Sequence, residues 1–322
     1  MDLFFFRTKT MLNRRQVRIK VFHALYAFFQ GEENDRARFD KALNKSFDDL
    51  FDLFLLELNF LVEVRRLAQE RLETEEKKYF PSEDKVKEYR ILSENSVLTK
   101  LEENLFLEDK LKNLPYSLDE DQSIVAGVLD SIMKEDWIVS SNLEGITFKK
   151  ESELVMNIFN AFVAPNEELH HLFLEKNIHW ADDIPLVNSA MQKFLKGIKA
   201  SDDKYAALPV KISDDEIIPF GRSLFIKTLN NNESTEKIIV ENVKNWELDR
   251  IALIDLILIK MAMTEFLEFK EIPVKVTINE YIEICKDYST PKSKVFVNGV
   301  LDKSQKLLKE QGKLVKTGRG LL

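Results

Sequence analysis

Glycine and proline are scarce in this chain of 322 residues, which contains nine Gly and eight Pro. An all-β fold needs turn residues roughly every 8–12 positions, and so few glycines and prolines cannot supply them. The glycines also form no phosphate-binding loop and no dinucleotide fingerprint. Hydrophobic residues make up 44% of the chain and charged residues 32%, a composition typical of folded proteins rather than disordered ones. The scarcity therefore predicts an all-α fold.

Cysteine and histidine are also rare, with one Cys and four His. The single cysteine, Cys285, cannot form an internal disulfide, which fits a reducing compartment. The histidines show no metal-ligand spacing with it, and the grouped His170, His171 and His179 are interpreted as surface residues. Carboxylates are plentiful, but no acid–base pair stands out among them. We therefore expect no metal, no other cofactor and no enzymatic activity.

Long uncharged runs are absent as well. The most apolar stretch, residues 251–267, is interrupted by Asp255, Lys260 and Glu265. A membrane span needs about 20 mostly uncharged residues, so none is predicted. The apolar part of residues 1–6 is too short for a secretory signal and too few cations precede it. These features predict a cytoplasmic protein.

The net charge of −8 is distributed unevenly along the chain. Residues 1–20 carry a net charge of +5 and residues 292–322 a net charge of +6, which leaves −19 for the rest. Basic ends attract a polyanion, while an acidic remainder limits indiscriminate binding. Basic tails are also often only solvated, so charge alone leaves both interpretations open.

The first strong helix signal runs from Asn13 to Gln30. Apolar residues recur there at helical spacing, at Val17, Val21, Ala24, Leu25 and Phe28. Asn13 is a suitable N-cap. Arg14, Arg15 and Arg18 follow within a turn and a half, where cations oppose the helix dipole at a cost of a few tenths of a kcal/mol each. Such a cluster suggests a polyanionic ligand. Residues 1–10 are interpreted either as an extension or as a mis-assigned start before Met11.

Further helices are expected along the chain. Residues 46–80 predict one long helix, with Ser46 and Asp49 resembling a capping box and Pro81 ending it. A core is expected to be filled by five aromatic residues, which are Trp180, Phe159, Phe173, Trp137 and Phe162. The remaining predicted helices span residues 83–92, 95–112, 119–135, 151–163, 166–176, 184–198, 216–229, 233–245, 248–269, 275–287 and 291–310. For the last one, Thr290 and Pro291 are the predicted N-cap and first helical residue.

Two stretches resemble the NusB family of transcription antitermination factors. The first, residues 14–26, looks like the family's arginine-rich first helix ending in Ala-Leu-Tyr. The second, residues 249–304, contains Ile-Pro-Val-Lys-Val-Thr-Ile-Asn-Glu and, further on, Phe-Val-Asn-Gly-Val-Leu-Asp. The resemblance implies a first NusB-like helix at 11–30 and a NusB-like C-terminal helical subdomain at 211–322. Residues 31–210 then form a large helical insertion within the N-terminal subdomain, making this a long-form member.

The resemblance also implies a function. NusB-like proteins fold as two small helical subdomains and pair with NusE, a small-subunit ribosomal protein. Together they bind the boxA element of nascent single-stranded RNA and join the transcription elongation complex, notably on ribosomal RNA operons. The residues that match the family's RNA-binding positions are Arg14, Arg15, Arg18, Lys20, Lys294 and Phe296. Those that match partner-facing positions are Tyr26, Asp249 and Asp255.

Each of these assignments has a structural alternative. The arginines contact phosphate or form only a solvated helix start, and Gln16 stands where the family often has another arginine. Phe296 stacks on an unpaired base or packs in the core. Tyr26 faces the partner or the core, and the two aspartates are partner contacts or ordinary surface charge. The family pattern places Asn298-Gly299 inside a helix, with Gly299 permitting close packing.

Two rival functions remain at this stage. NusB-like domains occur fused to RNA methyltransferases, but such an enzyme needs a glycine-rich cofactor domain on parallel strands, which this chain does not offer. The other rival is a helical protein–protein scaffold that kept the NusB fold without specific RNA binding. The long helix at 46–80 and the acidic residues of the insertion would suit protein partners.

Overall fold

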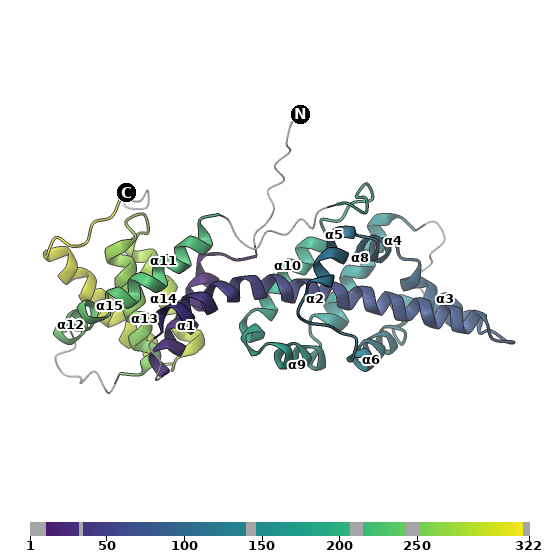
Figure 1. Ribbon diagram of the computed structural model, residues 1–322, viewed down its shortest axis with the longest axis horizontal. Helices are drawn as coiled ribbons and strands as arrows, with labels where there is room; N and C mark the ends of the chain where they lie inside the picture. The colour runs from purple at the N-terminus through teal and green to yellow at the C-terminus, as the bar shows by residue number, and fades with distance from the viewer. Residues whose placement is uncertain (1–10, 32–34, 140–145, 207–214, 243–250, 318–322) are drawn as a thin grey trace, which may run out of the picture. The chain divides into compact units, whose positions relative to one another are not determined.

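The computed structural model describes residues 11–31, 35–139, 146–206, 215–242 and 251–317, and these residues contain helices and no β-strand (Figure 1). The predicted all-α fold is confirmed. Within these ranges no helix is long and apolar enough to cross a membrane.

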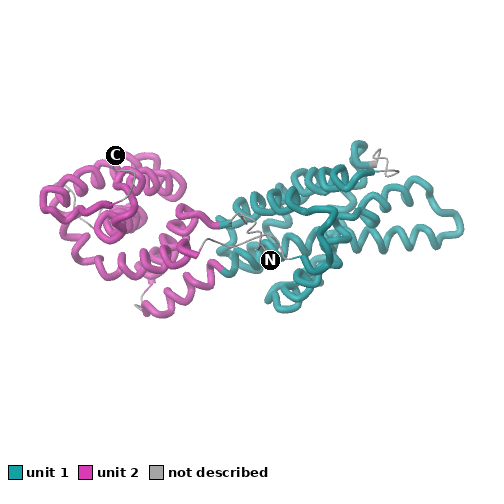
Figure 2. Tube along the Cα trace, turned by 90° about the horizontal axis from the view of Figure 1, so that it is seen from above, with its two compact units in different colours: residues 1–11, 48–212 teal, residues 12–47, 213–322 magenta. Residues whose placement is uncertain are grey.

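The chain folds as two compact units, coloured separately in Figure 2. The terminal unit consists of residues 12–47 and 213–322, and the central unit of residues 1–11 and 48–212. Helix α2 (Arg36–Glu76) contributes to both. The boundary between the two units thus lies within α2. The predicted helix start at Ser46 is wrong, because Ser46 lies inside α2, where its Oγ donates to Leu43 O at 2.7 Å.

The terminal unit is built around one helix that is apolar on all sides, α13 (Leu253–Glu268). It contacts the other helices of the unit, which are α1 (Arg14–Gln30), α11 (Ile217–Asn230), α12 (Asn232–Asn242), α14 (Val274–Tyr288) and α15 (Ser293–Glu310). The side chains of Ile257, Leu258 and Ile259 point in successive directions around α13, and all three are fully buried. A helix apolar all round is stable only in such a central position.

Helix α1 begins as its sequence predicts. The side chain of Asn13 accepts hydrogen bonds from Arg15 N and Gln16 N, at 2.8 and 3.3 Å. Gln16 Oε1 in turn accepts from Asn13 N at 3.0 Å, which completes a capping box. Asn13 is therefore the N-cap, and it fixes where the arginines of α1 start.

Close packing in this unit depends on Gly221 rather than on Gly299. A Cβ atom on Gly221 would overlap Val17 Cγ1 and lie 3.3 Å from Phe47 Cζ, so α11 approaches α1 closely only because residue 221 has no side chain. Asn298 and Gly299 do lie within α15, as predicted. The packing role predicted for Gly299 is wrong, because a Cβ atom there would meet nothing within 4 Å.

The start of α15 differs from the prediction, and the segment after its end returns to α13. The helix begins at Ser293, so the predicted capping pair Thr290 and Pro291 is wrong; Thr290 instead shares a 2.9 Å hydroxyl hydrogen bond with Ser293. After the helix, Gly312 has a φ of +69°, a value that favours glycine and reverses the chain. Lys316 then returns to α13, where its Nζ donates to Glu265 O at 2.8 Å and Phe269 O at 2.9 Å. This cation satisfies carbonyls at the C-terminal end of α13.

The central unit contains the rest of α2 and a set of shorter helices. These are α3 (Glu83–Ser93), α4 (Ser96–Glu102), α5 (Leu105–Lys112), α6 (Gln122–Ile132), α7 (Asp136–Val139), α8 (Phe148–Ile158), the π-helical turn Phe159–Val163, α9 (Glu167–Lys176), the 3₁₀ turn Ile178–Asp182 and α10 (Ile184–Leu195). The helix predicted at 95–112 is two helices, because Asn104 caps a new one by accepting from Leu107 N.

The aromatic core predicted for the central unit is confirmed in part. Trp180, Phe159 and Phe173 are buried, and the indole N–H of Trp180 donates to Asp49 O at 2.9 Å. Trp137 is 41% exposed and stacks against the half-buried Phe162. The core of this unit is therefore organised around Trp180 rather than around both tryptophans.

Candidate nucleic-acid interface

The start of α1 borders a shallow depression of about 450 Å³ in the terminal unit. Arg14 and Arg15 line it from α1, and Pro273 and Val276 line it from the residue before α14 and from the first turn of that helix. Two carboxylates, Glu271 and Glu280, also line it. Val276 is 46% exposed although it is aliphatic. The depression therefore combines cations with an exposed apolar surface, which suits a nucleotide as well as any small polar ligand.

Arg15 is held by Glu280 of α14. Its Nε and Nη2 donate to the two carboxylate oxygens at 2.9 and 2.8 Å, and the arginine side chain remains 43% exposed. The hydrogen bond from Arg15 lowers the pKa of Glu280 below its ordinary value. Because the pair is partly solvated, its guanidinium is oriented but still reachable by an anion.

Arg14 is half-buried, and its guanidinium lies over an aromatic ring. Its guanidinium carbon is 5.2 Å from the centroid of the Phe220 ring, which in turn packs against Phe269 with centroids 5.2 Å apart. Among the residues that the structure describes, Arg14 has no carboxylate partner. The cation–π contact therefore orients Arg14 without neutralising its charge.

Arg18, one helical turn further along, is in a different environment. Its side chain is 2% exposed, and its Nε and Nη2 donate to the carboxylate of Glu265 at 2.6 and 3.0 Å. Glu265, itself fully buried, also accepts from Thr277 Oγ1 at 3.1 Å and from Tyr281 Oη at 2.8 Å. Burial alone would lower the pKa of Arg18, but the hydrogen bond and the charge of Glu265 outweigh it and raise the pKa.

This geometry leaves Arg18 no solvent-facing guanidinium surface for a phosphate. Its ion pair joins α1, α13 and α14 at the centre of the terminal unit. We therefore assign Arg18 to the fold and do not include it in the RNA-binding residues proposed below.

The sequence contained a signal for this buried pair that the sequence reasoning did not use. Asp255, Lys260 and Glu265 interrupt an otherwise apolar helix, and charged residues in such a position need partners. All three are buried and partnered. Lys260 Nζ lies 2.5 Å from Glu236 Oε1, and Asp255 Oδ1 accepts from Ser289 Oγ at 2.6 Å.

The other predicted RNA-binding residues do not lie together. Lys20 is 8% exposed. Lys294 is exposed in the first turn of α15, and Phe296 beyond it is half-buried. Helix α15 starts shortly after Tyr288, whose ring packs on His23 with centroids 5.2 Å apart. Lys294 therefore lies on α15, whereas Arg14 and Arg15 lie at the start of α1.

The predicted partner residues are also spread out. Tyr26 is half-buried, and its hydroxyl accepts from Gln30 Nε2 at 3.3 Å. Asp255 is 5% exposed, and its bond to Ser289 joins the first turn of α13 to the segment before α15. Asp249 lies outside the described residues. Of the three, only Tyr26 has a side chain that is placed and partly accessible.

Comparison with known proteins matches the C-terminal part of the chain to one family. The model of the NusB family matches residues 188–306, a range that includes α11, α12, α13, α14 and most of α15. These residues are similar to the NusB family. No solved structure matches the chain.

Three relatives carrying the name "Transcription antitermination protein NusB" illustrate the similarity. The protein of Salinibacter ruber is 52% identical over 103 residues, which cover 32% of this chain and 64% of the relative. That of Chloroherpeton thalassium is 40% identical over 111 residues, covering 34% of this chain and 53% of the relative. That of Clostridium botulinum is 41% identical over 85 residues, covering 26% and 64%. The chain therefore spans less than two thirds of each of these NusB proteins.

Proposed function

We propose that this protein is an RNA-binding transcription antitermination factor that acts with NusE on boxA-type RNA and supports transcription of ribosomal RNA operons. The observation that supports the proposal most is the NusB-family match over residues 188–306, together with relatives that are named for antitermination. Two helices of this match, α11 and α13, pack against α1, which carries Arg14 and Arg15.

In this proposal the RNA contacts the start of α1 first. Arg14 has no carboxylate partner among the described residues, and Arg15 is oriented by Glu280 yet 43% exposed, so both can meet phosphates. From Arg14 to His23 the helix rises about 13 Å, at about 1.5 Å per residue. A single strand that follows α1 over this distance passes from Arg14 and Arg15 toward His23.

The test is a fluorescence titration of a boxA-type RNA and a scrambled RNA, with and without NusE, at several salt concentrations. We expect tighter binding to boxA, strengthened by NusE. The logarithm of the binding constant falls linearly with the logarithm of the salt concentration, and we call the steepness of this line the salt slope. Replacing Arg14 and Arg15 by Ala should reduce the salt slope, because each lost phosphate contact removes roughly 0.7 from it for single-stranded RNA. Arg36→Ala is the matched control, because Arg36 is an exposed arginine of the same unit that donates to Asn230.

Two outcomes would contradict the proposal. Equal binding of both RNAs by the folded protein with NusE present would favour a scaffold that kept the NusB fold without specific RNA binding. A salt slope that is unchanged by Arg14→Ala and Arg15→Ala would show that the RNA contacts lie elsewhere.

A further inference from the structure

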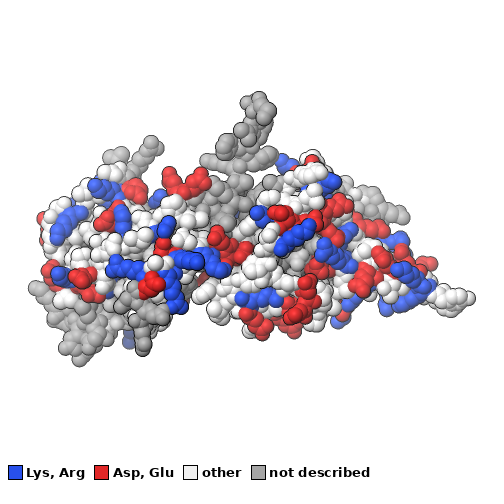
Figure 3. Space-filling view, in the orientation of Figure 1, with Lys and Arg blue, Asp and Glu red and all other residues white. Residues whose placement is uncertain are grey.

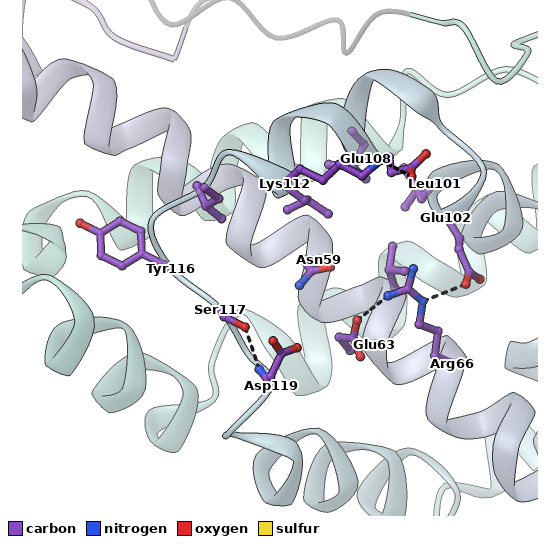
Figure 4. Close-up of a pocket in the computed structure, with 14 residues that line it drawn as sticks. Asn59, Glu63, Arg66, Leu101, Glu102, Glu108, Lys112, Tyr116, Ser117 and Asp119 are labelled. Carbon is purple, nitrogen blue, oxygen red and sulfur yellow. Dashed lines mark hydrogen bonds and ion pairs between the residues drawn. The ribbon is translucent and has the colours of Figure 1, made fainter.

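The central unit contains a groove of about 380 Å³ that is lined by both apolar and charged side chains (Figure 4). Three of the apolar lining residues, Val62 of α2, Leu101 and Leu107, are buried. Leu111 and Leu114 line it as well, and both are only half-buried. This volume lies near the lower end of the range of about 300–1,000 Å³ that is usual for ligand pockets.

One side of the groove carries a fixed group of charges. Arg66 Nη1 donates to Glu63 at 2.8 Å, and Arg66 Nε donates to Glu102 at 2.8 Å, as the dashed lines in Figure 4 show. Glu102 also forms an ion pair with Arg65. The two arginines hold these carboxylates in place, so this side is ordered before any ligand arrives.

The other charges of the rim are more exposed. Glu108 is 51% exposed and pairs with Lys112 across one turn of α5 at 2.7 Å. Asp119 is exposed; its backbone N–H donates to Ser117 Oγ at 3.0 Å, and no cation is paired with it among the described residues. Pairs such as Glu108 with Lys112 are worth little in water and open readily. Both carboxylates are therefore available to a cationic ligand.

The charge of the central unit indicates which ligand fits. Residues 48–212 contain 20 Lys and Arg against 33 Asp and Glu, a net charge of −13. Acidic side chains are spread among basic ones over the face of this unit that Figure 3 shows. A field of this sign repels nucleic acids and anionic lipids and attracts cationic partners.

We propose that the groove binds a basic peptide segment of another protein. An apolar side chain of that segment enters between Leu111 and Leu114, while flanking Lys or Arg side chains meet Glu108 and Asp119. The site is separate from the proposed RNA surface of the terminal unit. It gives the central unit a role in binding a protein partner and does not depend on RNA binding.

The experiment uses the full-length protein and a fluorescein-labelled synthetic peptide of alternating Lys and Leu, followed by fluorescence anisotropy. Glu108→Gln should weaken binding by roughly threefold and Leu111→Lys by about tenfold or more, the usual sizes for a rim charge and for an apolar anchor. Glu153→Gln in α8 is the matched control, since Glu153 is also an exposed glutamate with a lysine one turn away, Lys149. It should leave the affinity unchanged. Circular dichroism confirms that each variant is folded.

Further measurements decide the location and the ligand class. Peptides with Glu for Lys, or with Ser for Leu, should bind at least tenfold more weakly, since both features contribute. Hydrogen exchange should slow at residues 101–119 when the Lys-Leu peptide is bound. The proposal is overturned if Leu111→Lys and Glu108→Gln bind the peptide as tightly as Glu153→Gln. It is also overturned if hydrogen exchange slows elsewhere in the protein on peptide binding and not at residues 101–119.

Discussion

Removing the guanidinium of Arg18 should destabilise the terminal unit strongly. Arg18→Met deletes both charge-assisted hydrogen bonds to Glu265, at 2.6 and 3.0 Å. Among the described residues, Thr277 and Tyr281 then remain as the donors to this fully buried carboxylate. Breaking a buried ion pair by removing one partner costs about 3–5 kcal/mol. We expect a loss of that size in the free energy of unfolding of this unit.

The double variant Arg18→Met with Glu265→Gln should be more stable than Arg18→Met alone. It buries no charge, and the glutamine oxygen still accepts from Tyr281 or Thr277. The expected coupling energy is about 2 kcal/mol, within the range of about 0.5–3 kcal/mol for residues in contact. Glu265→Gln alone should lower the free energy of unfolding less than Arg18→Met does, because Glu280 lies 3.7 Å from Arg18 and remains as a second carboxylate.

The assay uses Cys285, the only cysteine of the chain. It is fully buried in α14, and burial raises the pKa of its thiol to about 11, so the folded unit reacts slowly with thiol reagents. Labelling of Cys285 at increasing urea concentrations therefore reports unfolding of the terminal unit separately from the central one. Arg36→Ala serves as the control, and we expect it to change the free energy of unfolding by no more than about 0.5 kcal/mol.

If Arg18→Met lowered the free energy of unfolding by less than about 1 kcal/mol, this reasoning would be refuted, given the usual cost of an unpaired buried charge. It would also be refuted if the free energy lost by the double variant equalled the sum of the losses of the two single variants. If Arg18→Met abolished RNA binding without changing the labelling of Cys285, the residue would act at the RNA and not in the fold.

Further predictions concern the buried Glu57 and Gly221 and the exposed Gly299. Glu57, buried in α2 with one carboxylate oxygen unpartnered, has a pKa raised well above its ordinary value by desolvation. The folded state then holds a proton that the unfolded state releases above about pH 4.3, so stability falls as pH rises. Glu57→Gln should raise the urea midpoint at pH 8 and flatten this dependence, whereas an equal effect of the exposed control Glu70→Gln would contradict the assignment. Gly221→Ala should cost about 1–3 kcal/mol through overlap with Val17. Gly299→Ala should stabilise the protein by up to about 1 kcal/mol. A Gly221→Ala variant that melts at a higher temperature than Gly299→Ala would contradict the close packing assigned to Gly221.

The sequence by itself determined the helical class and much of its detail. Scarce glycine and proline exclude a β fold. Asn13 predicts where α1 starts, because its side chain can cap the backbone N–H groups that follow it. The apolar circumference of α13 likewise predicts its central place in a bundle. These features depend on residues close together in the chain, so local chemistry is sufficient to predict them.

Only the tertiary structure decided which arginines of α1 are available. Arg14 and Arg18 are one helical turn apart and look equivalent in the sequence, yet Arg14 lies on the Phe220 ring and Arg18 is buried against Glu265. A buried cation is tolerated only where an opposite charge meets it. Here that charge comes from a residue 247 positions away, and no local pattern in α1 specifies it.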